Sequence, residues 1–272
     1  MGTQVLRPVA LTIAGSDSAG GAGIEADLKT FEVHGVWGAA AVTAVTAQNS
    51  LGVQTSEGVS PEVVRAQMAS VASDFRVDAA KTGMLVDADT TMTVAQTVGQ
   101  LGIRPLVVDP VLVSTHGDTL LDLDGIDVLR EHLLPLATVV TPNLAEAAVL
   151  AQQTVDGRET MEDAAAAIAA HGPPVVLVTG GHLLGDSSPD CLYVEGYIRW
   201  LESPRLPVVH NHGSGCVLSA SICAELARGM EPADACVAAK RFTERALAAG
   251  FRLGSGIGPV DPGWKRYARG DR

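Results

Sequence analysis

The sequence predicts an α/β protein in which helices cover both faces of a central, mainly parallel β-sheet. Short runs of β-branched and other apolar residues alternate with longer alanine-rich segments along the chain. Several short runs are apolar at every position, as strands buried on both faces are. Repeated strand–helix–strand units build parallel sheets with right-handed crossovers. Because no Pro/Gly/Ser-rich linker divides them, we expect a single domain over residues 1–272.

The apolar runs predict the strands in order along the chain. The first is VALTIA, the fourth PLVVD and the last VVLVT. A segment of different character, CLYVEGYIRWL, predicts a hairpin at a sheet edge that turns at Glu195-Gly196. The predicted strands cover residues 9–14, 39–45, 79–82, 105–109, 138–141 and 175–179, and the hairpin covers 191–201.

Helical patterns fill the segments between the strands. One begins at Ser60-Pro61-Glu62, because serine favours the N-cap, proline the first helical position and an acid the first turn. We expect it to end near residue 74. The other helices are predicted over residues 88–101, 127–134, 144–152, 161–170, 215–228 and 232–249.

Composition excludes several classes of protein. Hydrophobic residues make up 47% of the 272 residues, which is enough for a large core and excludes intrinsic disorder. The 31 acidic and 19 basic residues give a net charge of −12. Nucleic-acid affinity depends on basic side chains that neutralise phosphates, so we expect no nucleic-acid partner. A small phosphorylated ligand stays open, because backbone N–H groups can hold phosphate.

The chain also lacks the patterns of membrane, secreted and zinc-binding proteins. It has no run of about 18 apolar residues and no signal-peptide cleavage pattern, so we expect a cytoplasmic protein that does not enter a membrane. Its four cysteines include no C-x-x-C pair and are too few for a disulfide scaffold.

Four segments that follow predicted strands are expected to meet, because open α/β sheets bind ligands beyond the carboxyl ends of their strands. The segments are residues 14–17, 109–111, 141–143 and 179–181. The first continues into GSDSAGGAGIEAD, whose glycines permit close backbone approach to a ligand, although the spacing fits neither a dinucleotide fingerprint nor a P-loop. A plain strand–helix turn is the alternative. Asp27, which ends this segment, is either solvated or aimed into a pocket.

The motif HGSGC precedes a predicted helix and predicts an anion hole. N–H groups from Gly213, Ser214, Gly215 and Cys216 can point at one group of oxygens, and the helix dipole adds partial positive charge. The same environment favours the thiolate of Cys216, so we expect a lowered pKa. The alternative is a buried cysteine that packs as a small hydrophobe.

Two acidic residues at strand ends are candidate metal ligands. Asp109 ends a predicted strand, and Glu146 lies in the first turn of the following helix, three residues after Asn143. Mg²⁺ is commonly held by one or two such carboxylates beside nucleotide phosphates. Helix-dipole complementarity is the alternative for Glu146, and a turn before Pro110 is the alternative for Asp109. These residues are compatible with phosphoryl transfer.

Together, the motifs resemble those of the hydroxymethylpyrimidine/phosphomethylpyrimidine kinases of thiamine biosynthesis. They occur in the family's order as VALTIAGSDSAGGAGIEADLKTF, AVTAVTAQNSLGVQ, KTGML, VVDPVL, TPNLAEA, GGHL, HGSGC and GIGPV, from about Val9 to Val260. The resemblance implies a ribokinase-like three-layer α/β/α fold, ATP and Mg²⁺ as co-substrates, and a homodimer. It also implies a kinase that phosphorylates 4-amino-5-hydroxymethyl-2-methylpyrimidine and then its monophosphate.

The resemblance also implies a role for each matching position. It places hydrogen bonds to the aminopyrimidine at Asp27 and Gln48, and it puts Cys216 where sugar kinases carry an aspartate base. The remaining implied positions are Gly15, Met84 and Val111 in the pyrimidine pocket, Gly213, Ser214 and Gly215 in the anion hole, Asp109 and Glu146 near Mg²⁺, and Asn143, Thr179, Gly181 and Lys240 at the nucleotide.

The implied reaction is attack by the hydroxymethyl oxygen on the γ-phosphorus of ATP. Because the transition state is loose, positioning and electrostatics matter more than a strong base, so a thiol at position 216 can suffice as proton acceptor. Two polar, glycine-containing loops beside the expected site, residues 114–121 and 181–189, are candidate lids.

Two alternatives remain open. A pyridoxal kinase would share the fold and the glycine motif, although an acid such as Asp27 would repel the phenolate of pyridoxal. A pyrimidine-binding protein without phosphoryl transfer is the other. Two departures from the family pattern favour it, namely Thr179, where many members have lysine, and Asn211, where threonine is usual.

Overall fold

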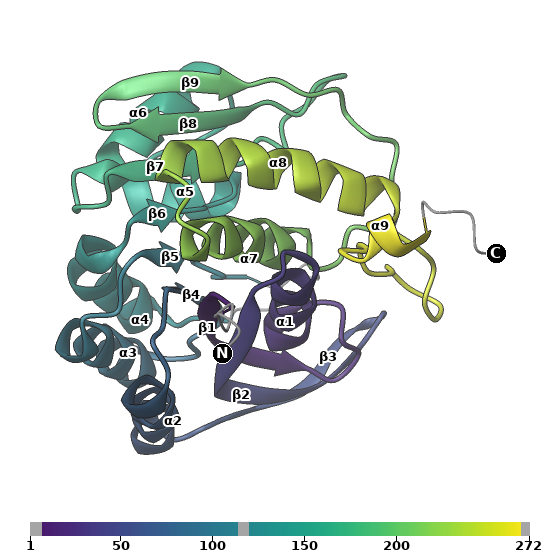
Figure 1. The fold of residues 1–272 in the computed structure, drawn as a ribbon. Helices are drawn as coiled ribbons and strands as arrows, with labels where there is room; N and C mark the ends of the chain where they lie inside the picture. Colours follow the sequence, from purple (N-terminus) through teal and green to yellow (C-terminus); the bar gives the residue numbers. More distant parts are fainter. Residues whose placement is uncertain (1–6, 114–119, 268–272) are drawn as a thin grey trace, which may run out of the picture.

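A nine-stranded, mainly parallel β-sheet forms the centre of the molecule (Figure 1). The computed structural model describes residues 7–113 and 120–267. The strand order is β3-β2-β1-β4-β5-β6-β7-β8-β9. Neighbours from β2 to β7 run parallel, whereas β3 at one edge and the β8–β9 hairpin at the other pair antiparallel. The strands are β1 (Val9–Asp17), β2 (Trp37–Asn49), β3 (Gly52–Gly58), β4 (Ala79–Thr82), β5 (Leu106–Val108), β6 (Val139–Val140), β7 (Val175–Val178), β8 (Asp190–Val194) and β9 (Tyr197–Leu201).

Helices cover both faces of the sheet, which gives the expected three layers (Figure 1). One face is covered by α1 (Gly23–Val33), α7 (Ser214–Ala227) and α8 (Pro232–Ala248). The other is covered by α2 (Pro61–Asp74), α3 (Ala88–Leu101), α4 (Leu123–Val128), α5 (Leu144–Ala151) and α6 (Arg158–Ala169). A short helix, α9 (Trp264–Tyr267), lies near the end of the described chain.

Successive strand residues pack into opposite helical layers. Ala10 of β1 packs on the α7 side and Leu11 on the α3 side, and Val107 and Val108 of β5 divide in the same way. Both sides of a central strand are therefore buried, which explains why these runs are mostly apolar. The polar exception in the first run, Thr12, is buried and hydrogen-bonded to Asp27. Each large aliphatic side chain fully buried in this way contributes about 1.5–3 kcal/mol.

The edge that carries β3 differs from the sequence prediction. The strand expected over 39–45 extends to Asn49, and the chain then turns back as β3. β3 is largely exposed and polar, so a search for apolar runs did not find it. The extension matters for the site because it carries Gln48.

The opposite edge is the predicted hairpin. β8 and β9 turn at Glu195 and Gly196, whose φ angles of 47° and 97° belong to a tight two-residue turn. The helix expected over 127–134 is instead divided among α4, a π-helical turn at Leu129–Leu133 and a 3₁₀ turn at Leu134–Leu136. Pro135 limits the helical path here, because it has no backbone N–H to donate.

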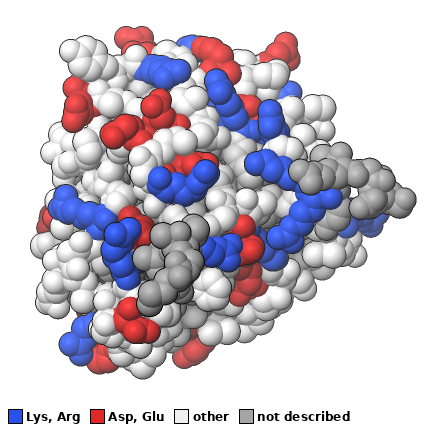
Figure 2. All heavy atoms as spheres, viewed as in Figure 1, with Lys and Arg blue, Asp and Glu red and all other residues white. Residues whose placement is uncertain are grey.

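The surface carries charges of both signs. On the face in Figure 2, acidic and basic side chains are interspersed over the atoms that are not grey. Within the described ranges, none of the helices has the length and apolar character needed to cross a membrane.

Candidate functional site

A cavity of about 1350 Å³ opens at the carboxyl ends of the parallel strands. The four strand-end segments expected to meet all contribute to its lining, for example through Gly15, Asp109, Asn143 and Thr179. They converge because parallel strands place their carboxyl ends at one edge of the sheet. Gly181 lies on the same lining.

Gly213 brings the start of α7 against the first glycine loop. Its φ of 80° is left-handed, and a Cβ there would lie 1.9 Å from the carbonyl oxygen of Gly21. Glycine is therefore required at this turn. Ser214, Gly215 and Cys216 follow as the first residues of α7 and line the cavity. Ser214 N already donates a 3.2 Å hydrogen bond to the Asn211 carbonyl, which corrects the expectation that all four N–H groups are free. Helix starts carry free N–H groups and partial positive charge, so the rest of this turn can receive an anion.

The expected lowered pKa of Cys216 is wrong. Burial raises the pKa of this thiol to about 12, and the Lys81 ammonium and the Gly23 N–H offset only part of that effect. The side chain also packs against an apolar cluster that includes Ala26 and Val260. The helix start is outweighed because desolvation of the buried sulfur is the largest effect, and the carboxylates of Asp27 and Asp109 add to it. At neutral pH, Cys216 is a thiol.

Asp27 does not line the cavity, which corrects both alternatives considered for it. Its Oδ1 and Oδ2 lie 3.0 and 3.1 Å from Nζ of Lys81, and its Oδ2 accepts a 2.6 Å hydrogen bond from Thr12 Oγ1. Both charged side chains are fully buried. Burial alone would lower the pKa of Lys81, but the acidic groups around it, Asp27 foremost and Asp109 among them, together outweigh that effect and raise the pKa. Lys81, and not Asp27, contributes to the cavity wall.

Asp109 and Glu146 form a pair of buried carboxylates at the cavity. Burial, together with the charge of Asp109, raises the pKa of Glu146 to about 7. Burial also raises the pKa of Asp109, against the opposing effects of Lys81 and a 2.8 Å hydrogen bond from Ser219 Oγ. Two adjacent carboxylates whose charge is poorly balanced are suited to a hard divalent cation.

The N-terminus of α5 fixes Glu146 in place. Glu146 Oε2 accepts a 2.9 Å hydrogen bond from Asn143 N, and Asn143 Oδ1 accepts one of 3.0 Å from Glu146 N, which is a capping box. Oε1 accepts a 3.4 Å hydrogen bond from Leu112 N. Glu146 thus serves the start of α5, as the alternative interpretation expected. The same carboxylate also lines the cavity, so the two interpretations do not exclude each other.

The neighbouring Thr141 supplies a further oxygen. Its buried Oγ1 has no hydrogen-bond partner within the described residues, and Thr141 lines the cavity beside Glu146. No cluster of three or more His, Cys, Asp or Glu that could hold a metal occurs in residues 7–113 and 120–267. The donor set therefore suits Mg²⁺, which keeps waters and phosphate oxygens as ligands, better than a fully caged metal.

Lys240 does not offer a free ammonium to a nucleotide. Its Nζ lies 2.8 Å from Oδ2 of Asp190 at the start of β8 and donates a 3.0 Å hydrogen bond to the Ser188 carbonyl. Asp190 also accepts a 2.9 Å hydrogen bond from Gly180 N. Lys240 lines the cavity, but its charge is already balanced, so the expected direct role at the nucleotide is not supported.

The other residues expected at the pyrimidine all line the cavity. They are Gly15, Gln48, Met84 and Val111. A Cβ on Gly15 would lie 3.1 Å from the Met84 sulfur, so glycine leaves room for that side chain. Val111 has a φ of 44°, which is strained for a β-branched residue and is found mainly where function maintains it.

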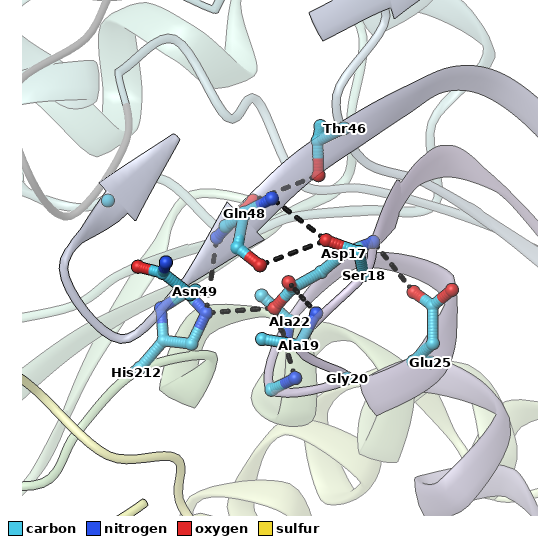
Figure 3. A network of polar contacts seen from close by, with 12 residues as sticks. Asp17, Ser18, Ala19, Gly20, Ala22, Glu25, Thr46, Gln48, Asn49 and His212 are labelled. Atoms are coloured by element: carbon cyan, nitrogen blue, oxygen red, sulfur yellow. Dashed lines mark hydrogen bonds and ion pairs between the residues drawn. The ribbon is translucent and has the colours of Figure 1, made fainter. Parts of the chain in front are cut away.

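Asp17 joins the two glycine loops (Figure 3). Its Oδ2 accepts hydrogen bonds from Gly21 N at 3.0 Å and Ala22 N at 2.9 Å, and it lies 3.0 Å from Nε2 of His212. Its Oδ1 accepts a 2.8 Å hydrogen bond from Ala19 N. Burial alone would raise the pKa of Asp17, but these hydrogen bonds outweigh it and lower that pKa. Asp17 is thus a carboxylate.

The same histidine reaches Gln48 (Figure 3). Gln48 Nε2 lies 3.3 Å from His212 Nε2, and Gln48 Oε1 lies 3.3 Å from Thr46 Oγ1. Ser18 holds the backbone of Gln48 through a 2.9 Å hydrogen bond to its carbonyl and a 2.8 Å bond from its N–H. Gln48, Thr46, Asp17 and His212 all contribute to the cavity wall.

Residues 17–261 match the family model described as phosphomethylpyrimidine kinase. The chain belongs to the phosphomethylpyrimidine kinase family. A relative from Streptomyces coelicolor, named hydroxymethylpyrimidine/phosphomethylpyrimidine kinase, is 49% identical over 96% of this chain and 96% of its own. A relative of the same name from Rhizobium meliloti is 48% identical over 94% of this chain and 97% of its own. Family membership makes the chain a phosphotransferase.

Solved kinase structures share this family member's fold. Bacillus subtilis pyridoxal kinase, as an ADP complex, has a TM-score of 0.90 at 38% identity, over 96% of this chain and 100% of its own. Staphylococcus aureus pyridoxal kinase with AMP-PCP and pyridoxal has a TM-score of 0.88 at 33% identity, over 97% and 96%. Phosphomethylpyrimidine kinase from Clostridium difficile has 0.79 at 34%, over 89% and 100%. The expected ribokinase-like fold is confirmed.

Lys81, Asp17 and His212 were not among the residues predicted for this kinase site. Each lies inside a motif that carries the family resemblance, namely KTGML, GSDSAGG and HGSGC. The motifs therefore lie in the segments that form the site. The hydrogen-bond and ion-pair partners of these side chains, however, come from distant parts of the chain. Of the expected lid loops, residues 114–119 lie outside the described residues, whereas Gly181 and His182 line the cavity.

Proposed function

We propose that this chain transfers the γ-phosphoryl group of ATP to 4-amino-5-hydroxymethyl-2-methylpyrimidine and then to its monophosphate, in thiamine biosynthesis. The names of the Streptomyces and Rhizobium relatives support this assignment. The observation that carries it is one cavity that combines Gln48, the Gly213–Cys216 helix start and the Asp109–Glu146 carboxylates. A hydrogen-bonding group, an anion site and a cation site are what this transfer requires.

The residues at the two ends of this cavity have separate tasks. Gln48 hydrogen-bonds the aminopyrimidine edge, and Gly15, Met84 and Val111 enclose the ring. The α7 start, from Gly213 to Cys216, binds the oxygens of the transferring phosphoryl group, and its dipole stabilises their charge. Asn143, Thr179 and Gly181 face the nucleotide.

Cys216 contacts the substrate hydroxymethyl group as a thiol. With a pKa of about 12 it orients the attacking oxygen and is not a ready base. A loose transition state tolerates this arrangement, because little charge develops on the attacking oxygen before transfer is advanced. Positioning therefore supplies more of the rate than proton abstraction does.

Asp109 and Glu146 would hold Mg²⁺, with the Thr141 hydroxyl beside them. The cation would neutralise charge on the nucleotide phosphates. It would also balance the two buried carboxylates, since burial, together with the charge of Asp109, raises the pKa of Glu146.

A pyridoxal kinase is the second candidate, since the pyridoxal kinases from Bacillus subtilis and Staphylococcus aureus have TM-scores of 0.90 and 0.88 with this chain. The expected repulsion between Asp27 and the phenolate of pyridoxal does not apply, because Lys81 neutralises Asp27 outside the cavity lining. The choice between the two substrates depends on Gln48 and its surroundings.

The test is an ATP-dependent phosphorylation assay with the hydroxymethylpyrimidine and with pyridoxal, in which mass spectrometry separates mono- and diphosphates. We expect the pyrimidine diphosphate. Monophosphate alone would restrict the activity to the first step, and faster turnover of pyridoxal would establish the second candidate. Binding of the pyrimidine without any product would support a pyrimidine-binding protein without phosphoryl transfer. The Thr179 and Asn211 departures from the family pattern would then explain the missing activity.

We further propose that the chain works as a single kinase domain, in a homodimer and in the cytoplasm, where ATP is available. Exposed Trp37, Val45 and Leu51 on and beside the β2–β3 edge provide apolar surface for a second copy. Sedimentation of the full chain, which we expect at the dimer mass, tests the assembly.

A further inference from the structure

We propose that Asp17 and His212 are positioning residues that fix which way the Gln48 carboxamide faces, and that this orientation selects an aminopyrimidine over pyridoxal. The inference rests on the proposed function, in which Gln48 binds the substrate ring. Asp17 and His212 act through Gln48, without a required contact of their own to the substrate.

The first step is the tautomer of His212. The Asp17 carboxylate has no proton to give and already accepts hydrogen bonds from Ala19, Gly21 and Ala22. The 3.0 Å contact between Asp17 Oδ2 and His212 Nε2 is attractive only if the proton lies on Nε2. Asp17 therefore makes His212 a hydrogen-bond donor at Nε2.

The second step is the hydroxyl of Thr46. Its Oγ1 lies 2.8 Å from the Ser16 carbonyl and 3.3 Å from Gln48 Oε1. A hydroxyl has one proton, and the shorter contact is with a carbonyl that can only accept. Thr46 therefore donates to Ser16 and can only accept from Gln48.

These two assignments determine the amide. The single proton of His212 Nε2 already points to Asp17 Oδ2 at 3.0 Å, so Nε2 has no lone pair for an NH₂ group, and the Gln48 carbonyl oxygen is its only favourable neighbour, as a second and weaker acceptor of that N–H. An acceptor at Thr46 Oγ1 requires the NH₂ group of Gln48. The two ends of a carboxamide have nearly the same shape, so a half-turn about the last side-chain bond satisfies both contacts at the observed 3.3 Å separations. The proton inventory thus assigns the Gln48 oxygen to His212 and its nitrogen to Thr46.

A clamped amide presents a fixed pattern to the cavity. The clamp leaves one N–H and one oxygen lone pair of Gln48 free to bind a substrate. The N–H lies on the Thr46 side and the lone pair on the His212 side. An aminopyrimidine edge, with a ring nitrogen next to an exocyclic amine, matches this pattern in one register. Pyridoxal offers a phenolate oxygen and no amine, so it leaves the Gln48 oxygen without a donor. Sites that hydrogen-bond a substrate N–H discriminate strongly against analogues that lack it.

The test compares kcat and KM for the pyrimidine and for pyridoxal in the full chain. His212→Leu removes the donor, whereas His212→Gln keeps an N–H near the position of Nε2. For His212→Leu we expect KM for the pyrimidine to rise about tenfold with kcat within about threefold, and the pyrimidine-to-pyridoxal ratio of kcat/KM to fall about tenfold. His212→Gln should recover most of that ratio.

Thr46→Val tests the other end of the clamp with nearly unchanged shape. It lies on β2 and contacts the first glycine loop through the Ser16 carbonyl, but not the loop that carries His212, so its result stands even where His212→Leu folds poorly. We expect the ratio to fall in the same direction, about threefold. Unchanged ratios in both His212→Leu and Thr46→Val would overturn the proposal.

His210→Ala is the matched control. His210 Nδ1 accepts a 3.0 Å hydrogen bond from Gly258 N and anchors the same loop as His212, but it is not part of the cavity lining. We expect it to leave the ratio unchanged. If it lowers the ratio as much as His212→Leu does, general loosening of the loop explains the result and the positioning role is wrong.

Calorimetric binding of the pyrimidine separates this inference from the proposed function. If the wild-type chain binds the pyrimidine but phosphorylates nothing, the proposed function fails, and weaker binding by His212→Leu with recovery in His212→Gln still supports the clamp. If the wild type phosphorylates the pyrimidine and His212→Leu binds it equally well, only the clamp fails. A wild type that does not bind the pyrimidine overturns both.

Discussion

Two buried charge pairs near the same cavity balance their charges in opposite ways. Asp27 and Lys81 lie 3.0 Å apart and neutralise each other within the protein. Asp109 and Glu146 are both acidic, and neither is in an ion pair within the described residues. Burial and the charge of Asp109 both raise the pKa of Glu146, whereas burial raises the pKa of Asp27 and Lys81 opposes that effect. The charges of the first pair are balanced within the folded protein, whereas the second pair needs a cation to balance its charges. An unbalanced buried charge is therefore the better sign of a ligand site.

The largest expected effect comes from dividing the complete pair. Lys81→Met leaves the Asp27 carboxylate buried and alone, which should cost about 3–5 kcal/mol in the free energy of unfolding, measured with urea. Replacing both partners, as Asp27→Leu with Lys81→Met, should recover most of that loss, because no charge stays unpaired. The comparison would be broken if Asp27→Asn kept full stability but abolished pyrimidine binding, since Asp27 would then bind the substrate.

The incomplete pair should respond to metal instead. Mg²⁺ without nucleotide should raise the melting temperature of the wild type, because a cation that binds only the folded state stabilises it by about 2.7 kcal/mol at 100 times Kd. Glu146→Gln should lose this response and be no less stable than wild type without Mg²⁺, since glutamine also completes a capping box.

Glu159→Gln is the control for that measurement. Glu159 is an exposed acid in the first turn of α6, as Glu146 is an acid in the first turn of α5, but Glu159 does not line the cavity. It should keep the full Mg²⁺ response. A Glu146→Gln protein that still gains stability from Mg²⁺ would place the cation elsewhere.

A smaller effect is expected at Cys216. Cys216→Ala should lower kcat about tenfold while the pyrimidine Kd stays within about twofold, because the thiol orients the hydroxymethyl group and is not a ready base. A loss of about 10²–10⁴-fold would instead be typical of a general base. Undiminished turnover would remove Cys216 from the catalytic role.

The sequence predicted what depends on local pattern. Buried parallel strands are mostly apolar, so the sheet centre and the β8–β9 hairpin could be predicted, whereas the polar and exposed β3 could not. The helix that follows HGSGC was predicted over 215–228 from local pattern, and α7 covers Ser214–Ala227.

What depends on distant partners could not be predicted. Asp27 is separated from Lys81 by 54 positions and Asp17 from His212 by 195. Neither pairing leaves a mark in the local sequence. The sign of the Cys216 pKa shift was missed for the same reason, since desolvation by distant segments outweighs the helix start that the motif displays.

The smallest expected effect tests how completely the Asp27–Lys81 pair cancels. Alkylation of Cys216 by iodoacetamide follows its thiolate fraction, so a pKa of about 12 predicts a slow rate that rises about tenfold per pH unit between pH 8 and 10. Lys81 favours the thiolate and Asp27 opposes it. Replacing both by Met and Leu should thus leave the rate, followed by peptide mass spectrometry, within about threefold. A larger drop in the alkylation rate would show that Asp27 does not fully cancel the effect of the Lys81 charge on Cys216. The Asp27–Lys81 and Asp109–Glu146 pairs would then differ only in how far their charges are balanced.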